Sequence, residues 1–423
     1  MLADWHTPAA APPATVRDGP GPWRTAGWTA GRMAALLASL EAAAPDLAAL
    51  PAGRLLAAWQ GAVAAFRDPA SEERRRLDPA LARATRLSPP GLSAGLEAVL
   101  GGVAGEHAAV VFAAARPPGA GGRLPPALVV LAGNLPALAV QPLLPALAMR
   151  RPVVLKSSRA EPLCAPAFLA ALAAREPVLG EATAGLTWPG GEAALEAPLL
   201  ARCDPVLAYG EAETVADLAR RATGRLVAYG PRTSVALVGP GAEAAAVAEG
   251  IARDVALFDQ RGCLSVAAVY TVLEPAELAR ALAAALAERG RRWPPGPATV
   301  GEAAAVRQVR DEAVMAGCRL EPLDPASGTV VTDPRPTFRP TPGRRTVRVH
   351  PVAALDRAVE ALAPWRGRLQ GAALAGMTED EEGRLRRALA DLGVSRFTAP
   401  GLLQSPDARW QNGGVDPLEV LGV

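Results

Sequence analysis

The chain has 423 residues, which is enough for two or three domains and for a core that needs neither disulfides nor a structural metal. Its 44 basic and 42 acidic residues leave a net charge of +2, and half of its residues are apolar. This composition excludes an intrinsically disordered chain and argues against a binder of nucleic acid or of anionic membranes, which would carry a basic excess.

Lys156 is the single lysine of the chain, and the other 43 basic residues are arginines. A compact ammonium on a flexible stem and a planar guanidinium are not interchangeable. Either Lys156 occupies a site that requires an ammonium, or it has survived by chance in a sequence biased toward arginine.

Cysteine and histidine usage predicts no metal site. No C-x-x-C or H-E-x-x-H pattern occurs, and the four cysteines are far apart in the sequence (Cys164, Cys203, Cys263 and Cys318). Free thiols are typical of a reducing compartment, and the first residues lack the features of a signal peptide. We therefore expect a cytoplasmic protein, with His6 in a disordered arm and His350 either near an active cleft or, more commonly for such a residue, structural.

The N-terminal part predicts helices after a loose start. Residues 1–25 are rich in Pro, Ala and Gly and predict an arm. Helices are expected between residues 30 and 66, with breaks at Pro45 and Pro51, and again between residues 78 and 103. Within the last range, Gly91-Leu-Ser-Ala-Gly95 matches the G-x-S-x-G pattern of a hydrolase nucleophile, but no apolar strand precedes it. We interpret it as the start of a helix.

Residues 124–149 form a charge-free stretch long enough to span a bilayer. The stretch contains five prolines and a polar Gly133-Asn134 pair, and each proline in a helix interior costs about 3 kcal/mol. A buried strand, a turn and a packed helix are therefore predicted, with no integral membrane association.

From residue 128 onward, short apolar runs alternate with helical patterns. Strands are expected at 128–131, 152–155, 185–188 and 205–208, and helices at 136–148, 165–174, 192–201 and 212–222. This alternation predicts a parallel sheet whose strands are covered on both faces.

A second α/β region follows residue 224. A strand is expected at 233–238, a helix at 242–257, a polar turn at 259–263 and a strand at 265–272, with further alternation to about 399. The predicted division is an N-terminal arm and helical region, a dinucleotide-binding domain, a catalytic domain, and a C-terminal tail returning to the first domain (1–85, 86–232, 233–400 and 401–423).

Four polar or reactive positions are expected at strand ends, where α/β proteins bind ligands. They are Asn134 after one strand, Lys156 at the end of the next, Tyr209-Gly210-Glu211 after another, and Cys263 in the polar turn. Gln260, Arg261 and free backbone N–H groups near Cys263 could stabilise a thiolate.

This ordered set resembles the aldehyde dehydrogenase superfamily, and within it the LuxC-type acyl-CoA reductases. The resemblance covers roughly residues 80–423. It is carried by Asn134-Leu-Pro, by the strand that ends in Lys156-Ser-Ser, by Ala208-Tyr-Gly, and by Asp259-Gln-Arg-Gly-Cys-Leu-Ser265. It is supported by the stretches at 82–88, 229–234, 393–401 and 410–414.

The resemblance implies an aldehyde-dehydrogenase-like α/β fold and a set of roles. Cys263 would attack an acyl-CoA thioester, expected to carry a fatty acyl group, and Asn134 with a backbone N–H would hold the oxyanion. NADPH, with NADH as the alternative, would be bound by residues after three strands (Gly133, Lys156, Ser158, Arg159, Gly210 and Glu211).

Two positions depart from the family pattern. Ala228 occupies the position of the general-base Glu of aldehyde-oxidising members, which favours a reductase over an aldehyde oxidase. The ribose-binding Glu is also missing near Val349-His-Pro351, which weakens the expected placement of the nicotinamide and keeps a catalytically weak member as an alternative. Glu211 would repel a pyrophosphate unless its side chain turns away. The hypotheses that stay open are an NADPH-dependent acyl-CoA reductase, a reductase of acyl phosphates or carrier-bound acyl groups, and a non-catalytic scaffold. A homo-oligomer or an acyl-transfer partner protein is possible.

Overall fold

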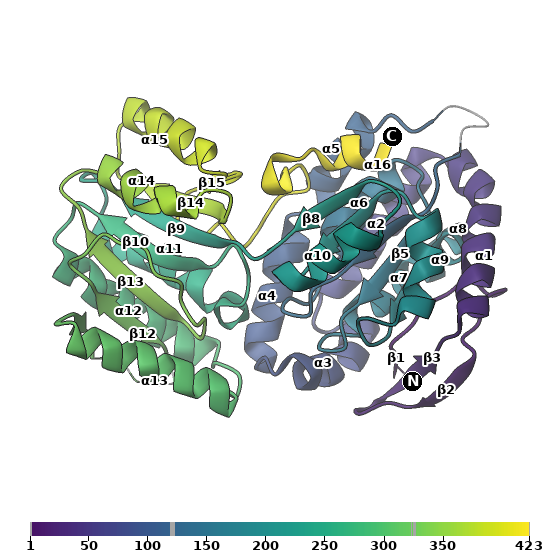
Figure 1. Ribbon diagram of the computed structural model, residues 1–423, viewed down its shortest axis with the longest axis horizontal. Helices are drawn as coiled ribbons and strands as arrows, with labels where there is room; N and C mark the ends of the chain where they lie inside the picture. Colours follow the sequence, from purple (N-terminus) through teal and green to yellow (C-terminus); the bar gives the residue numbers. More distant parts are fainter. Residues whose placement is uncertain (1, 119–122, 323, 325–326, 423) are drawn as a thin grey trace.

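The computed structural model describes residues 2–118, 123–322, 324 and 327–422. Figure 1 shows two lobes, each built around its own sheet, joined by the connection from β8 to β9 and by a C-terminal segment that crosses back. A small three-stranded sheet lies beside the first lobe near the N-terminus.

The first lobe contains a five-stranded parallel sheet in the order β6-β5-β4-β7-β8. The strands are β4 (Ala127–Val130), β5 (Val153–Ser157), β6 (Thr183–Thr187), β7 (Val206–Tyr209) and β8 (Leu226–Tyr229). The chain runs outward from β4 first on one side and then on the other. The gap between the carboxyl ends of β4 and β7 is therefore a topological switch point, where such sheets bind ligands.

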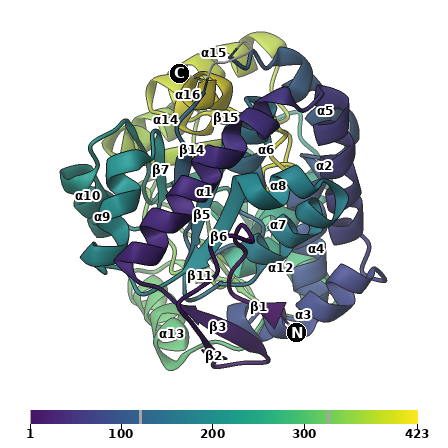
Figure 2. The ribbon, with the colours of Figure 1, turned by 90° about the vertical axis from the view of Figure 1, so that its right-hand side faces the viewer.

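Helices cover both faces of this sheet, as the apolar strands require. They are α1 (Ala30–Ala49), α2 (Ala52–Arg67), α3 (Glu72–Thr85), α4 (Pro89–Gly101), α5 (Gly105–Ala114), α6 (Val140–Ala148), α7 (Cys164–Arg175), α8 (Pro177–Ala182), α9 (Ala193–Arg202) and α10 (Ala212–Arg221). Leucines of α1 pack with β4–β7 on one face, and Figure 2 shows α1 crossing this side of the lobe. Helices α2, α4, α6 and α7 share the larger core of the other face.

The second lobe contains a seven-stranded sheet in the order β11-β12-β13-β10-β9-β14-β15, parallel except for β11. The strands are β9 (Thr233–Val238), β10 (Val266–Thr271), β11 (Arg319–Leu320), β12 (Thr329–Thr332), β13 (Thr346–Pro351), β14 (Leu369–Ala375) and β15 (Arg396–Thr398). One face packs on α11 (Ala244–Ala256) and α12 (Pro275–Arg292), and the other on α14 (Asp356–Leu362) and α15 (Glu379–Asp391). Helix α13 (Val300–Met315) lies beside β11 and β12.

The prediction of a loose N-terminal arm is wrong. Residues 2–27 form β1 (Leu2–Ala3), β2 (Thr15–Asp18) and β3 (Trp23–Gly27), seen near the N-terminus in Figure 2. His6 is not disordered: it exchanges two backbone hydrogen bonds of 2.8 Å with Gly185 at the edge of β6, and burial lowers the pKa of its imidazole to about 4. Composition missed this segment because the residues of β2 are exposed and form no apolar run, and because the partner of His6 lies far away in the sequence.

Three local expectations have different outcomes. The helix break at Pro51 is confirmed, whereas Pro45 lies inside α1. Ser88 accepts a hydrogen bond from the Gly91 backbone N–H and caps α4, so the G-x-S-x-G segment is a helix start. β8 was not predicted, because its half-exposed residues do not form a clear apolar run.

Residues 124–149 form β4, a loop and α6, as predicted, and do not span a membrane in one helix. By length and hydropathy, the helical stretch Pro89–Ala114 is the one that passes as a candidate span among the described residues; α1 and α2, bent by 111°, pass only as a pair. Half of the Pro89–Ala114 window is buried inside the protein, as in a packed core helix.

After β15 the chain returns to the first lobe, where α16 (Pro417–Gly422) packs on α6. The buried Arg151 guanidinium donates to the Leu421 carbonyl at 2.6 Å and ties this end down. We propose the division 1–85, 86–232, 233–400 and 401–423, in which the first and last segments both pack against the first lobe.

Candidate functional site

A cleft of about 1400 Å³ lies between the two lobes. Its walls include the ends of β4, β5 and β7 and the turn before β10. All eight candidate residues line it (Gly133, Asn134, Lys156, Ser158, Arg159, Gly210, Glu211 and Cys263). The structure thus brings together, in one cavity, side chains separated by up to 130 positions in the sequence.

Cys263 follows a turn with an unusual backbone. Phe258, Asp259 and Gln260 have φ values of 53°, 52° and 64°, which residues other than glycine rarely adopt. Each such residue costs of order 1 kcal/mol and persists only where surrounding contacts hold it. The turn is therefore held in place by its neighbours and not by local preference.

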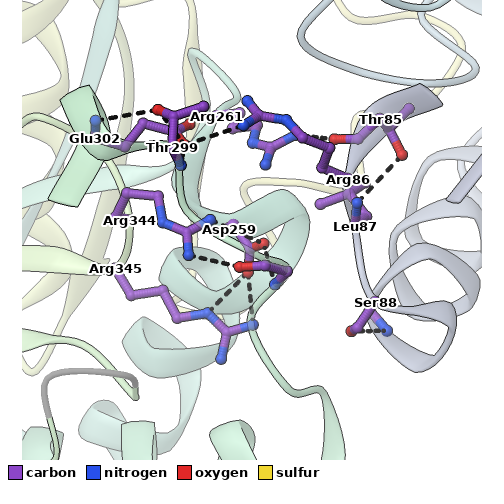
Figure 3. A network of polar contacts seen from close by, with 12 residues as sticks. Thr85, Arg86, Leu87, Ser88, Asp259, Arg261, Thr299, Glu302, Arg344 and Arg345 are labelled. Carbon is purple, nitrogen blue, oxygen red and sulfur yellow. Dashed lines mark hydrogen bonds and ion pairs between the residues drawn. The ribbon is translucent and has the colours of Figure 1, made fainter. Parts of the chain in front are cut away.

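Buried polar contacts hold this turn (Figure 3). The Asp259 carboxylate accepts from the Arg345 guanidinium at 2.8 Å and from the Gly296 backbone N–H at 2.9 Å. Asp259 and Arg345 are 3% and 1% exposed, so this ion pair is screened little by water. The Gln260 amide donates to the carbonyls of Val266 and Thr346, both at 2.8 Å.

The thiol of Cys263 lies in a half-buried site. Burial raises the pKa of this thiol to about 11, while Arg232 and the backbone N–H groups of Cys263 and Leu264 act in the opposite direction. At neutral pH the group is therefore a thiol. The Cys263 carbonyl accepts a hydrogen bond of 2.7 Å from the Ser234 hydroxyl, which fixes the backbone.

The expectation that Gln260 and Arg261 stabilise a thiolate is wrong. The Gln260 side chain is engaged with the backbone around it, and the Arg261 guanidinium donates to the Thr85 carbonyl at the end of α3. Arg232 takes the place expected of them, because it is the cation that favours ionisation of the thiol.

Asn134 lies in the loop after β4 and reaches the turn at 258–263. Its Nδ2 donates to the Arg261 carbonyl at 2.8 Å, two residues before Cys263. A primary amide has a second N–H, which remains for a ligand oxygen. The amide is thus oriented from the turn that carries the thiol.

The ends of β4 and β5 approach each other closely. A Cβ added to Gly133 would lie 2.5 Å from Ser158 Oγ and 2.8 Å from Ala160 Cβ, so only glycine fits. Lys156 Nζ lies 5.6 Å from the ring centroid of the buried Trp188, within reach of a cation–π interaction. Burial lowers the pKa of this ammonium.

The end of β7 leads directly into α10. The Gly210 backbone N–H donates to the Tyr229 carbonyl at 3.3 Å, which joins the ends of β7 and β8. Glu211 is exposed and makes no capping hydrogen bond, so the first backbone N–H groups of α10 stay available to an anion. Arg159 is exposed at the neighbouring strand end.

The remaining cysteines and His350 are structural. The other three thiols are buried. The His350 ring stacks on Tyr270 with centroids 5.0 Å apart, and its Nδ1 lies 2.6 Å from the Arg335 carbonyl oxygen. Among the residues that the structure describes, no group of three or more potential His, Cys, Asp or Glu ligands could hold a metal ion.

Sequence reasoning gave no role to several residues of the cleft wall. Arg232 follows β8, and Tyr209 stacks on Tyr229 with centroids 4.5 Å apart. Asn412 comes from the returning C-terminal segment and accepts from the Gln370 amide at 2.9 Å. For Arg232, the basic residue that ends Tyr229-Gly-Pro-Arg232 was a signal that the sequence offered. No sequence signal pointed to the contact of Asn412.

Comparison with solved structures shows the fold. A benzaldehyde dehydrogenase from Corynebacterium glutamicum matches with a TM-score of 0.72 at 13% identity, over 97% of this chain and 93% of that one. An aldehyde dehydrogenase from Physcomitrella patens matches with a TM-score of 0.71 at 14% identity, over 100% and 95% of the two chains. The expected α/β, aldehyde-dehydrogenase-like fold is confirmed.

Comparison with sequences identifies relatives. The long-chain acyl-protein thioester reductases of Aliivibrio fischeri and Photobacterium leiognathi are 23% and 22% identical over 309 residues, or 69% of this chain. These matches span 61% and 62% of the two relatives, so the chain covers about three fifths of their length. A family model described as acyl-CoA reductase (LuxC) matches residues 111–422. Because that match extends over most of the sequence, the chain belongs to the LuxC acyl-CoA reductase family.

Proposed function

We propose that the protein reduces an acyl-CoA thioester, with a fatty acyl group, to the aldehyde, using NADPH and a covalent thioester on Cys263. The observation that carries this proposal is the shared cleft: a thiol, an oriented amide and a glycine-lined strand-end site for a dinucleotide lie in one cavity. The relatives are named long-chain acyl-protein thioester reductases, and these names support a long-chain acyl donor.

In the first half-reaction, Cys263 exchanges its proton for the acyl group. Its sulfur attacks the thioester carbonyl, the carbon–sulfur bond to CoA breaks, and the CoA sulfur takes up the proton that Cys263 loses. Asn134, through the N–H that does not bond Arg261, holds the carbonyl oxygen as negative charge develops on it. Arg232 favours the thiolate during attack.

The residues at the strand ends fit a dinucleotide. The close approach at Gly133 leaves room only for backbone, and the N-terminus of α10 offers free N–H groups for a pyrophosphate. Lys156, Ser158 and Arg159 would hold the ribose and a 2′-phosphate, with Gly210 and Glu211 beside the pyrophosphate. When bound, a reduced nicotinamide supplies the hydride that converts the Cys263 thioester to aldehyde and free thiolate.

The cleft favours reduction over hydrolysis. Its acidic wall residues, within the described part of the chain, are Glu211 and Glu302. Glu302 accepts hydrogen bonds from Thr299 instead of facing the thiol, and the exposed Ala228 offers no base. With Glu302 engaged by Thr299, no base at Ala228, and Glu211 placed beside the pyrophosphate at the start of α10, no carboxylate is assigned to activate water, so the thioester should persist until hydride arrives.

A single assay tests the proposal. Oxidation of NADPH is followed with acyl-CoA donors from acetyl to palmitoyl, in the wild type and in Cys263→Ala, with NADH and with acyl phosphate and carrier-bound donors in parallel. We expect aldehyde formation that is abolished by Cys263→Ala. No activity with any donor, together with failure of Cys263 to react with a thioester probe, overturns the proposal in favour of a non-catalytic scaffold.

The alternative donors follow from the same geometry. Attack by Cys263 on an acyl phosphate or on a carrier-bound acyl group requires the same thiol and amide, and the relatives' names point to a protein-bound donor. Competition between donors in the assay decides among them, and a preference for the protein-bound donor would favour an acyl-transfer partner protein. The proposal includes a cytoplasmic location and a homo-oligomer. Sedimentation measures the oligomeric state.

A further inference from the structure

Three arginines gather where the lobes meet at one wall of the cleft, and Figure 3 shows them together. Arg86 follows α3, Arg261 belongs to the turn at 258–263, and Arg344 precedes β13. Arg86 and Arg261 line the cleft, together with Glu302 from α13. We call Arg86, Arg261 and Arg344 the arginine cluster. None of them has a role in the chemistry proposed for Cys263.

The nearby carboxylates do not neutralise the cluster. Asp259 is engaged by Arg345 and the Gly296 N–H, and its oxygen lies 3.7 Å from Arg344. Glu302 accepts from the Thr299 N–H at 2.7 Å and lies 3.6 Å from Arg86. With Arg345 included, four guanidinium groups face two carboxylates, and a net positive charge remains.

The cluster also has donors without acceptors. Arg261 Nη2 is buried and has no hydrogen-bond partner in the described part of the chain, and the buried Arg344 Nη1 has no hydrogen bond but only the 3.7 Å ion pair with Asp259. Buried donors are nearly always paired in folded proteins. A guanidinium matches the geometry of a phosphate, which accepts two parallel hydrogen bonds. The missing acceptor is therefore best supplied by an anionic ligand of this kind.

Arg86 is the member that a ligand can reach. Its side chain is 41% exposed, and an ion pair of 3.6 Å at such a site contributes little, so the guanidinium can leave Glu302 at small cost. Its φ of 56° is a helix-ending conformation that favours glycine.

We propose that the arginine cluster binds the phosphate of the acyl donor, which makes the substrate class a phosphate-bearing pantetheine thioester. This inference rests on the proposed function, because it concerns the donor that delivers the acyl group to Cys263. Coenzyme A and the phosphopantetheine arm of a carrier protein share this chemistry. An acyl group on a protein cysteine, which has no phosphate, does not.

The test compares donors with and without the phosphate. KM is measured for myristoyl-CoA, myristoyl-carrier protein and myristoyl-pantetheine in the wild type, Arg86→Gln and Glu302→Gln. Arg86→Gln should raise KM about tenfold for the donor that carries the phosphate, as expected for loss of a charge-assisted hydrogen bond, and leave myristoyl-pantetheine unchanged. Glu302→Gln should lower the same KM, because the competing carboxylate is gone while the amide oxygen still caps α13.

Arg76→Gln is the matched control, because Arg76 lies on α3 with a side chain 70% exposed and pairs with Glu72. Equal effects of Arg86→Gln on phosphate-bearing and phosphate-free donors overturn the inference but leave the proposed function standing. The rise in KM caused by Arg86→Gln is then compared between myristoyl-CoA and myristoyl-carrier protein. The donor with the larger rise is the source of the phosphate.

Calorimetry keeps the two hypotheses separate if no donor is reduced. Binding of 4′-phosphopantetheine and of pantetheine is then measured directly in the wild type and in Arg86→Gln. Tighter binding of the phosphorylated compound that is lost in Arg86→Gln supports the cluster without turnover. Equal binding of both compounds overturns it.

Discussion

The two walls of the cleft are built in different ways. The dinucleotide wall, which is the wall that we propose binds the cofactor, is formed by the ends of β4, β5 and β7 and follows from short local segments in which an apolar strand ends and a polar residue or a glycine follows. The nucleophile wall, formed by the turn at 258–263, has a backbone that its own residues disfavour and is held by Arg345, Gly296 and Thr346 from distant parts of the chain. The first wall should therefore be disrupted by an added side-chain atom at a strand end. The second should be disrupted by removal of a contact from a distant part of the chain.

The largest effect on the nucleophile wall is expected for Asp259→Asn. Removing one partner of a buried ion pair leaves an uncompensated Arg345 and should lower the free energy of unfolding by about 3 kcal/mol, measured by urea denaturation. Affinity for NADPH should change little in protein that remains folded. Asp356→Asn, in an exposed pair with Arg384, should cost under about 1 kcal/mol. A cost as small for Asp259→Asn would show that the turn does not depend on this pair.

The matching change on the dinucleotide wall is Gly133→Ala. The added Cβ must displace Ser158 and Ala160, so affinity for NADPH, measured by fluorescence titration, should fall about tenfold or more. Alkylation of Cys263 should keep its wild-type rate. Gly31→Ala, whose Cβ would meet nothing within 4 Å, is the control. Unchanged NADPH affinity in Gly133→Ala would contradict the placement of the dinucleotide at this wall.

The pH dependence of alkylation sharpens the description of the nucleophile wall. Because the thiolate reacts and the pKa of Cys263 is about 11, the rate with iodoacetamide should rise about tenfold per pH unit between pH 7 and 10. Arg232→Gln removes the cation that lowers this pKa, so the rate at pH 8 should fall about threefold. The Cys263→Ala variant supplies the background. A rate that levels off below pH 9 would contradict the raised pKa.

A similarly small effect is expected for Lys156→Arg. The substitution keeps the charge but replaces a compact ammonium beside Trp188 by a wider guanidinium, so affinity for NADPH should fall about threefold. Equilibrium titration with NADPH and NADH measures both affinities. An unchanged NADPH affinity would make the single lysine a chance survivor of the arginine-rich composition.

Much of the first lobe could be predicted because its signals are local. The strand ending in Lys156, the glycines at 133 and 210, and the helix after Glu211 follow from apolar runs and their ends. The N-terminal sheet was not predicted, since the four residues of β2 are all exposed and form no apolar run, and the bridge between His6 and Gly185 joins segments far apart in the sequence. The half-exposed β8 gave too weak a pattern.

The sequence by itself determined the alternating α/β architecture, the order of the reactive positions and the family, because strand and helix periodicity and short motifs are written in neighbouring residues. The tertiary structure decided the charge around the nucleophile. Gln260 and Arg261, adjacent to Cys263 in the chain, point to backbone partners, whereas Arg232 favours ionisation of the thiol. It also decided the arginine cluster, whose members come from three separate segments. Electrostatic environment depends on distance in space and on burial, and neither can be read from sequence separation.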